Sequence, residues 1–107
     1  MKVVERCTQR VKPGKFNEFI ALEKKFDAAE AKLGNVPPKR RYWAAHSALY
    51  NDTNVWEREW DSMADIEAYN KKTMDNPEWE PLFKEAGEVF FDGRFELFYL
   101  WDNFPEN

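Results

Sequence analysis

His46 is the only imidazole in the sequence, and it is the side chain best suited to moving a proton near neutral pH. A carboxylate beside an imidazole stabilises its protonated form, and Glu59 lies in a neighbouring predicted strand. We therefore predict His46 and Glu59 as the catalytic pair, with His46 as the acid–base group. The alternative is a structural histidine that is hydrogen-bonded inside a subunit interface.

Residues 55–61 alternate strictly in type, as a β-strand does when its two faces meet different surroundings. One face carries Trp56 and Trp60 with Arg58 between them, and the other carries two glutamates. We predict that the tryptophan face packs under helices. The glutamate face, shared with His46, is then expected to line the interior of a barrel. If the faces are reversed, Arg58 becomes a cation that faces a ligand.

Aromatic and charged side chains on the predicted sheet suit a small aromatic or amphipathic ligand. The candidate ligand-binding residues are Glu5, Tyr42, Trp43, Trp56, Glu57, Arg58 and Trp60. Core packing is the alternative for the tryptophans. Interstrand ion pairs are the alternative for the glutamates, because a buried carboxylate without a partner is costly.

Metal and cofactor sites are not predicted. One histidine with strand glutamates two residues apart is not a specific set of metal ligands. The sequence also has no phosphate loop, nucleotide fingerprint or Ser/His/Asp pattern. We therefore expect no cofactor, and we do not expect a hydrolase, a kinase or a nicotinamide-dependent dehydrogenase.

Length and composition predict a single domain over residues 1–107. The chain is 43% hydrophobic and 17% aromatic, with a formal net charge of -4. An acidic chain without a basic stripe argues against nucleic acid, and no apolar run reaches membrane-spanning length. The single cysteine, Cys7, forms no internal disulfide and is interpreted as a small buried hydrophobe. The N-terminus lacks the pattern of a signal peptide, which favours a cytoplasmic protein.

Hydrophobic periodicity and turn residues predict four strands and two helical regions within a core of about residues 2–101. The expected strands are 2–11, 40–49, 55–61 and 94–101. The first helical region is expected from residue 13 or 15 to residue 33, and the second in two segments, 63–74 and 77–87. Ser62 is expected to cap the second helical region, and residues 102–107 are expected to form a loose tail. As an alternative, Asp92 and Gly93 form the turn of a tight hairpin with residues 89–91.

The register of the hairpin around residues 51–54 depends on the length of its loop. A loop of two or four residues places Leu49 opposite Trp56 and His46 opposite Glu59. A loop of three or five residues would move His46 to the tryptophan face instead.

The resulting order is β-α-β-β-α-β, which predicts an α+β, ferredoxin-like fold with a four-stranded antiparallel sheet. Helices cover only one face of such a sheet. The other face needs cover, because an exposed sheet face that carries several aromatic side chains is an aggregation hazard.

Three motifs lie at the junctions of these elements. They are Val-Lys-Pro-Gly-Lys-Phe at 11–16, Trp-Asp-Ser-Met-Ala-Asp at 60–65 and Asp-Asn-Pro-Glu-Trp at 75–79. With these motifs, over about residues 3–101, the chain resembles the dimeric α/β-barrel superfamily, and most of all the NIPSNAP-like proteins. The resemblance implies a homodimer whose subunits pair sheet to sheet and close a barrel. It also implies a pocket between sheet and helices or within the barrel.

Three functions follow from this interpretation. The first is a NIPSNAP-like homodimer that binds a small molecule. The second is an enzyme of the cofactor-free monooxygenase, isomerase or dehydratase kind, with His46 as the acid–base group. The third is a structural or interaction module in which the dimer itself is the function. The fold does not choose among them.

Overall fold

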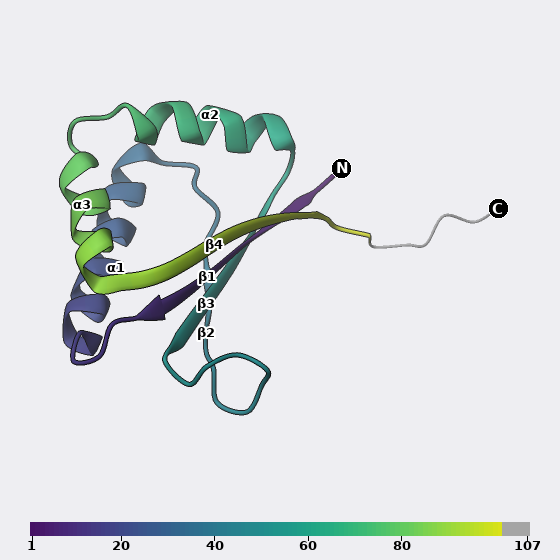
Figure 1. Cartoon of the computed structure of the whole chain (residues 1–107). Coiled ribbons are helices and arrows are strands. Elements are labelled where there is room, and N and C mark those ends of the chain that lie inside the picture. The colour runs from purple at the N-terminus through teal and green to yellow at the C-terminus, as the bar shows by residue number, and fades with distance from the viewer. Residues whose placement is uncertain (102–107) are drawn as a thin grey trace.

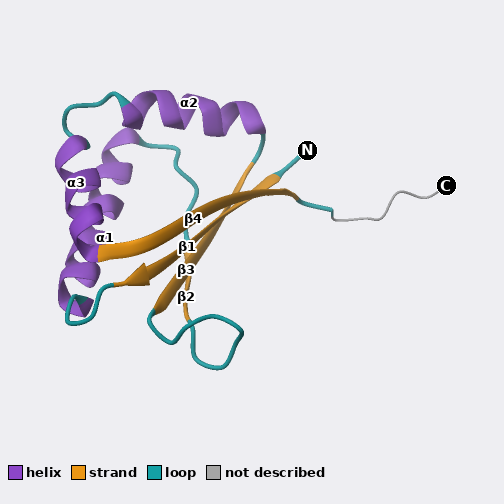
Figure 2. Cartoon of the chain, in the orientation of Figure 1, coloured by secondary structure: helices purple, strands orange, loops and turns teal. Residues whose placement is uncertain are grey.

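The structure, a computed structural model, describes residues 1–101. Figure 1 follows the chain from its N-terminus, and Figure 2 separates its helices from its strands. The elements in chain order are β1 (Val3–Val11), α1 (Phe16–Leu33), β2 (Arg40–Trp43), β3 (Thr53–Trp60), α2 (Met63–Met74), α3 (Glu80–Val89) and β4 (Phe90–Tyr99).

The four strands form one antiparallel sheet in the order β2-β3-β1-β4. All three helices lie on one side of the sheet (Figure 1). This is the predicted α+β, ferredoxin-like arrangement. The opposite side is called the open face here, and the strand registers place on it Val4, Arg6, Thr8, Tyr42, Val55, Glu57, Glu59, Arg94, Glu96 and Phe98.

Two apolar clusters hold the helices to the sheet, one near each end of β1. Val11 packs with Phe19, Leu22 and Val89 at one end, and Val3 packs with Trp60 and Ile66 at the other. Between these ends the helix side of β1 carries Glu5 and Cys7, which are both buried. The middle of the sheet therefore places a carboxylate under the helices rather than an apolar side chain.

The helix α2 begins where the sequence predicts. The Ser62 side chain accepts a hydrogen bond of 3.2 Å from the backbone N–H of Asp65, and this bond satisfies one free donor of the first helical turn. The cap fixes the point at which the chain leaves β3. It thereby fixes which α2 side chains face the sheet.

The strand β2 is shorter than predicted, and its register is different. It ends at Trp43 rather than at residue 49, and the partner of Trp56 is Arg41, not Leu49. The cause lies in the loop. Asp52 accepts two hydrogen bonds of 3.0 Å from the Arg10 guanidinium, and the ring of Tyr50 lies 3.8 Å from the same group. These contacts attach residues 50–52 to β1 instead of extending the hairpin.

The C-terminal elements also differ in their bounds from the prediction. The helix α3 continues through Gly87 to Val89, and β4 begins at once at Phe90. Asp92 and Gly93 therefore lie inside a continuous strand, opposite Arg10 and Gln9, and do not form the turn of a hairpin. The predicted tail, residues 102–107, lies outside the described residues.

Candidate functional site

Arg58 is the centre of a buried network of charged groups beneath the helices. Its side chain is 2% exposed. The Nε atom donates to the Oε1 atom of Glu5 over 2.7 Å, and the Nη1 atom donates to the Oε2 atom of Glu30 over 2.5 Å. The indole N–H of Trp60 donates to the same Glu5 oxygen over 2.9 Å. The network thus joins β1, β3 and α1 through one guanidinium.

Glu30 is the second centre of the network. The Tyr69 hydroxyl donates to the Oε2 atom of Glu30 over 2.6 Å, and the ammonium of Lys39 lies 3.3 Å from its Oε1 atom. The Lys39 side chain is 6% exposed, so this ammonium is nearly removed from water. The formal charges of the network cancel, because it contains two carboxylates, one guanidinium and one ammonium. This pairing offsets the free-energy cost of removing the four groups from water.

The electrostatic surroundings keep Glu30 and Arg58 ionised. Burial alone raises the pKa of Glu30, but the charges of Lys39 and Arg58 outweigh it and hold that pKa below its usual range. Burial likewise opposes the charge of Arg58, yet Glu5 and Glu30 raise the pKa of its guanidinium. Burial and the hydrogen bond to Glu30 raise the pKa of Tyr69. Tyr69 therefore remains a neutral donor at physiological pH.

Aromatic rings enclose the cations of the network. The Arg58 guanidinium lies 4.9 Å from the Trp56 ring, 5.0 Å from the Trp60 ring and 4.8 Å from the Tyr69 ring. The Lys39 ammonium lies 4.4 Å from the Trp56 ring. Such cation–π contacts strengthen as water is excluded. The tryptophan face thus packs under the helices, as predicted, and Arg58 lies there because Glu5 and Glu30 neutralise it.

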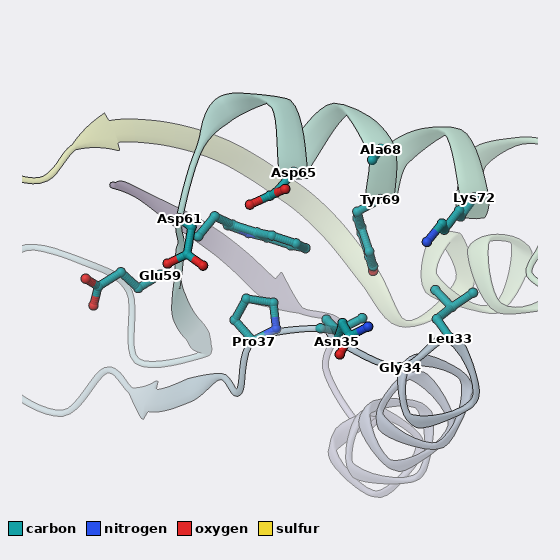
Figure 3. Close-up of a pocket in the computed structure, with 12 residues that line it drawn as sticks. Leu33, Gly34, Asn35, Pro37, Glu59, Asp61, Asp65, Ala68, Tyr69 and Lys72 are labelled. Carbon is teal, nitrogen blue, oxygen red and sulfur yellow. The ribbon is translucent and has the colours of Figure 1, made fainter. Parts of the chain in front are cut away.

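A cleft of about 360 Å³ opens beside this network, between α2 and the segment 34–37 that follows α1 (Figure 3). Trp60 and Tyr69 belong to both the network and the cleft wall. The other lining residues are Leu33, Gly34, Asn35, Val36, Pro37, Glu59, Asp61, Asp65, Ala68 and Lys72. The cleft therefore combines aromatic and apolar walls with charged groups.

A second cavity of about 340 Å³ shares residues 34–37 with the cleft. Glu30 and Lys39 line it. Each of the two spaces therefore reaches members of the buried network. The cleft and the network together form the candidate site.

The residues predicted as the catalytic pair lie at opposite ends of the β2/β3 ladder. His46 lies in the exposed loop beyond Trp43, whereas Glu59 lies beyond the pair of Arg40 and Glu57 at the other end. The hairpin register that paired His46 with Glu59 is therefore wrong. Within residues 1–101, no hydrogen bond or ion pair involves the His46 side chain. Their catalytic role stays a prediction.

The predicted ligand-binding residues divide between three places. Glu5, Trp56 and Arg58 lie in the buried network, and Trp60 also reaches the cleft. Trp43 lies at the end of β2, the edge strand of the sheet, and packs against Phe16 and Phe19 of α1. On the open face, Tyr42 lies beside Val55, and Glu57 accepts a hydrogen bond of 2.7 Å from Arg6.

Sequence reasoning missed three members of the site: Glu30, Lys39 and Tyr69. A signal for Glu30 exists, because Glu23 and Glu30 are seven residues apart and border the apolar stripe of α1, and both are buried. Glu23 pairs with Arg41 of β2 at 3.2 Å. Lys39 has no comparable periodic signal, because it lies in the linker before β2.

Two further observations concern the described residues only. Within residues 1–101, no group of three or more His, Cys, Asp and Glu side chains is arranged to hold a metal ion. Over the same residues, no helix has both the length and the apolar character needed to cross a membrane.

Burial raises the pKa of the Cys7 thiol, as expected for a small buried hydrophobe.

No protein-family model matches the sequence, and no characterised protein is similar to it in sequence. Solved structures are similar in fold. A NIPSNAP family protein from Agrobacterium tumefaciens superposes with a TM-score of 0.78 at 15% identity, over 94% of this chain and 87% of that one. The chain shares the fold of this NIPSNAP family protein.

Two more solved structures are similar to this chain in fold. A NIPSNAP-like domain protein from Burkholderia xenovorans has a TM-score of 0.75 at 12% identity, over 98% of this chain and 90% of that one. SnoaB, a cofactor-independent oxygenase from Streptomyces nogalater, has a TM-score of 0.72 at 13% identity, over 98% of both chains. At these identities the similarity establishes the fold alone.

Proposed function

We propose that the protein is a homodimer that binds a small amphipathic or aromatic molecule in the cleft between α2 and the segment 34–37. The observation that carries this proposal is the cleft itself. Its volume of about 360 Å³ suits a small molecule, and its walls combine apolar side chains with a few polar groups. The buried network behind it holds Trp60 and Tyr69 in fixed positions.

A preorganised wall favours binding because little side-chain freedom is lost when the ligand arrives. The Tyr69 hydroxyl is fixed on Glu30, and its ring packs against Trp60 at 5.3 Å between centroids. Both rings are thus immobile before any ligand enters. The apolar side chains of Leu33, Val36 and Pro37 provide the rest of the nonpolar surface.

Filling the cleft tests this proposal. Ala68 is exposed and lines the cleft, so Ala68→Phe should occupy space that a ligand needs. We expect the affinity for prodan, a small neutral dye whose emission responds to apolar surroundings, to fall by about tenfold or more, equivalent to a loss of about 1.4 kcal/mol. A fluorescence titration measures this change.

Ala64→Phe is the matched control, because Ala64 is exposed on the same helix but does not line the cleft. Its affinity for the dye should stay within about twofold of the parent protein, a difference below 0.5 kcal/mol or so. No dye binding to the parent protein, or equal losses in both variants, would contradict the cleft as the binding site. Native mass spectrometry of the purified protein adds a search for a ligand that copurifies.

The homodimer is proposed from the open face of the sheet, which no helix within residues 1–101 covers. Val4, Val55 and Phe98 lie on this face together with the ion pair between Arg6 and Glu57. The Arg6 guanidinium lies 4.8 Å from the Phe98 ring, so charged and aromatic groups alternate across it. The fold shared with dimeric α/β-barrel proteins supports a second copy of the chain as the cover.

The side chains of β4 provide a sharp test of this pairing. Phe98→Glu adds a carboxylate to the open face, beside Val4 and near Glu96. We expect the dimer to dissociate about tenfold or more readily, because the charge would lose its water on association. Analytical ultracentrifugation measures the dissociation constant.

Phe95→Glu is the control on the same strand, because Phe95 lies on the helix side opposite Cys7 and is 66% exposed. It should leave the dimer intact. A parent protein that sediments as a monomer would refute the dimer. A Phe95→Glu variant that dissociates while Phe98→Glu does not would place the interface on the other side of β4.

A further inference from the structure

One stripe of α2 faces the cleft and carries opposite charges at its two ends. Asp65, Tyr69 and Lys72 line the cleft from this helix. In Figure 3 the Asp65 carboxylate lies at the end near Asp61, the Tyr69 ring points down in the middle, and the Lys72 ammonium points inward at the other end. The cleft is therefore acidic at one end, aromatic in its middle and basic at the other end.

The helix fixes the separation of these charges. Asp65 and Lys72 are seven residues apart, which is close to two helical turns and places both on one face. A rise of 1.5 Å per residue separates their Cα atoms by about 10 Å along the helix axis. Because α2 is capped at Ser62 and packed through Ile66 and Tyr69, this separation does not depend on a mobile loop.

Neither terminal charge of the stripe is paired with another side chain, although Asp65 in the first turn and Lys72 in the last turn both suit the dipole of α2. Within the described part of the chain, the side chains of Asp61, Asp65 and Lys72 form no ion pair or hydrogen bond. By contrast, Glu59 at the rim lies 3.6 Å from Lys2 and points away from the cleft in Figure 3. The acidic and basic ends of the cleft are therefore available to a ligand.

We propose that the ligand is a zwitterion whose ammonium and carboxylate groups lie about 10 Å apart on an apolar body. This inference rests on the proposed binding function and specifies the chemistry of the ligand. The ammonium lies between Asp61 and Asp65, and the carboxylate meets Lys72. The apolar body lies along Tyr69 and Pro37, so that both charges keep a partner when they leave water.

A set of eight-carbon probes tests the proposal in the intact protein. The compound ω-aminooctanoate has an extended length of about 10 Å, whereas octylammonium and octanoate each lack one of its charges. Isothermal titration calorimetry should give ω-aminooctanoate an affinity about tenfold or more above either singly charged compound. Equal affinities of the three compounds would overturn the proposal.

Charge-neutral variants assign each end of the ligand. Asp65→Asn should reduce the affinity for ω-aminooctanoate toward that of octanoate, with Asp61 left as the one carboxylate beside the ammonium. Lys72→Gln should reduce it to about that of octylammonium. The matched controls are Glu67→Gln and Lys71→Gln, because both residues are exposed on α2 and neither lines the cleft. Control losses as large as those at Asp65 and Lys72 would mean a general surface effect and would overturn the assignment.

Binding of prodan distinguishes a failure of this inference from a failure of the proposed function on which it rests. Because the dye is neutral, it should bind the parent protein, Asp65→Asn and Lys72→Gln with similar affinity, which also shows that the cleft remains folded. Dye binding without a preference for ω-aminooctanoate would overturn the zwitterion and leave the binding cleft standing. A parent protein that binds neither probe would overturn both.

Discussion

Replacing Arg58 by methionine is expected to lower the free energy of unfolding by about 3 to 5 kcal/mol at neutral pH. Methionine fills much of the same volume, so the loss comes from charge rather than from a cavity. It leaves Glu5 without its cation and Glu30 with Lys39 alone. Urea unfolding followed by tryptophan fluorescence measures the difference.

The loss should shrink as the pH falls from about 7 to about 4, because a buried carboxylate without a partner is stable when protonated. In the parent protein, the pKa of Glu30 is held below its usual value. The ionised Glu30 therefore stabilises the fold at a pH above that usual value, and this stabilisation is lost as the pH falls and the carboxylate is protonated. In the variant, the carboxylates favour protonation, so its stability declines as the pH rises. The two stability curves should therefore converge in acid.

Arg41→Met is the control for this experiment. Arg41 also bridges two carboxylates, Asp27 at 2.7 Å and Glu23 at 3.2 Å, but its side chain is 35% exposed. Water screens this bridge, so we expect a loss of about 1 kcal/mol or less. A similar loss in both variants, or a loss in Arg58→Met that does not change with pH, would mean that unpaired burial is not the cause.

The sequence predicts the faces of β3 and the start of α2 because each depends on local chemistry. Strict alternation places Trp56 and Trp60 on the face of β3 opposite the glutamates. The indoles are large and apolar, so their face is the one that is buried. Ser62 caps α2 by a contact between residues three apart. Such signals need no knowledge of the rest of the fold.

The network around Arg58 was not predictable in the same way because its members come from five parts of the chain: β1, α1, the linker before β2, β3 and α2. Glu5, Glu30, Lys39 and Tyr69 each look like ordinary polar residues of a strand, a helix or a linker. Only the packing of α1 and α2 over β1 and β3 brings them together. The local indications of buried carboxylates were Arg58 on a tryptophan face and the spacing of Glu23 and Glu30 beside the apolar stripe of α1.

The error in β2 has a similar origin. Alternation continues in sequence to residue 49, but the chain leaves the sheet after Trp43. Arg10 binds Asp52 and lies against the rings of Tyr50 and Phe91, at 3.8 Å and 4.3 Å. These long-range contacts compete with the hairpin. His46 consequently lies in the loop rather than on the sheet.

Trp79→Ala is expected to destabilise the protein by about 3 to 5 kcal/mol, as the loss of a fully packed indole does. Trp79 is 3% exposed and lies at the N-terminus of α3. Its ring contacts Phe26 of α1, Tyr69 of α2 and Phe83 of α3, with centroids 5.9 to 6.1 Å apart. A single side chain therefore joins the three helices, and thermal or urea unfolding measures its contribution.

The same substitution should weaken ligand binding, because Tyr69 lines the cleft and packs edge-on against Trp79, which does not line it. Without that support the Tyr69 ring gains freedom that binding must remove, so the affinity for prodan should also fall. Trp43→Ala is the control, since Trp43 is 42% exposed and packs against Phe16 and Phe19 at the rim; it should cost about 1 kcal/mol and leave dye affinity unchanged. If Trp79→Ala lost stability but kept full dye affinity, the contacts of Tyr69 with Glu30 and Trp60 would be enough to hold the cleft wall, and the proposed link between Trp79 and binding would be wrong.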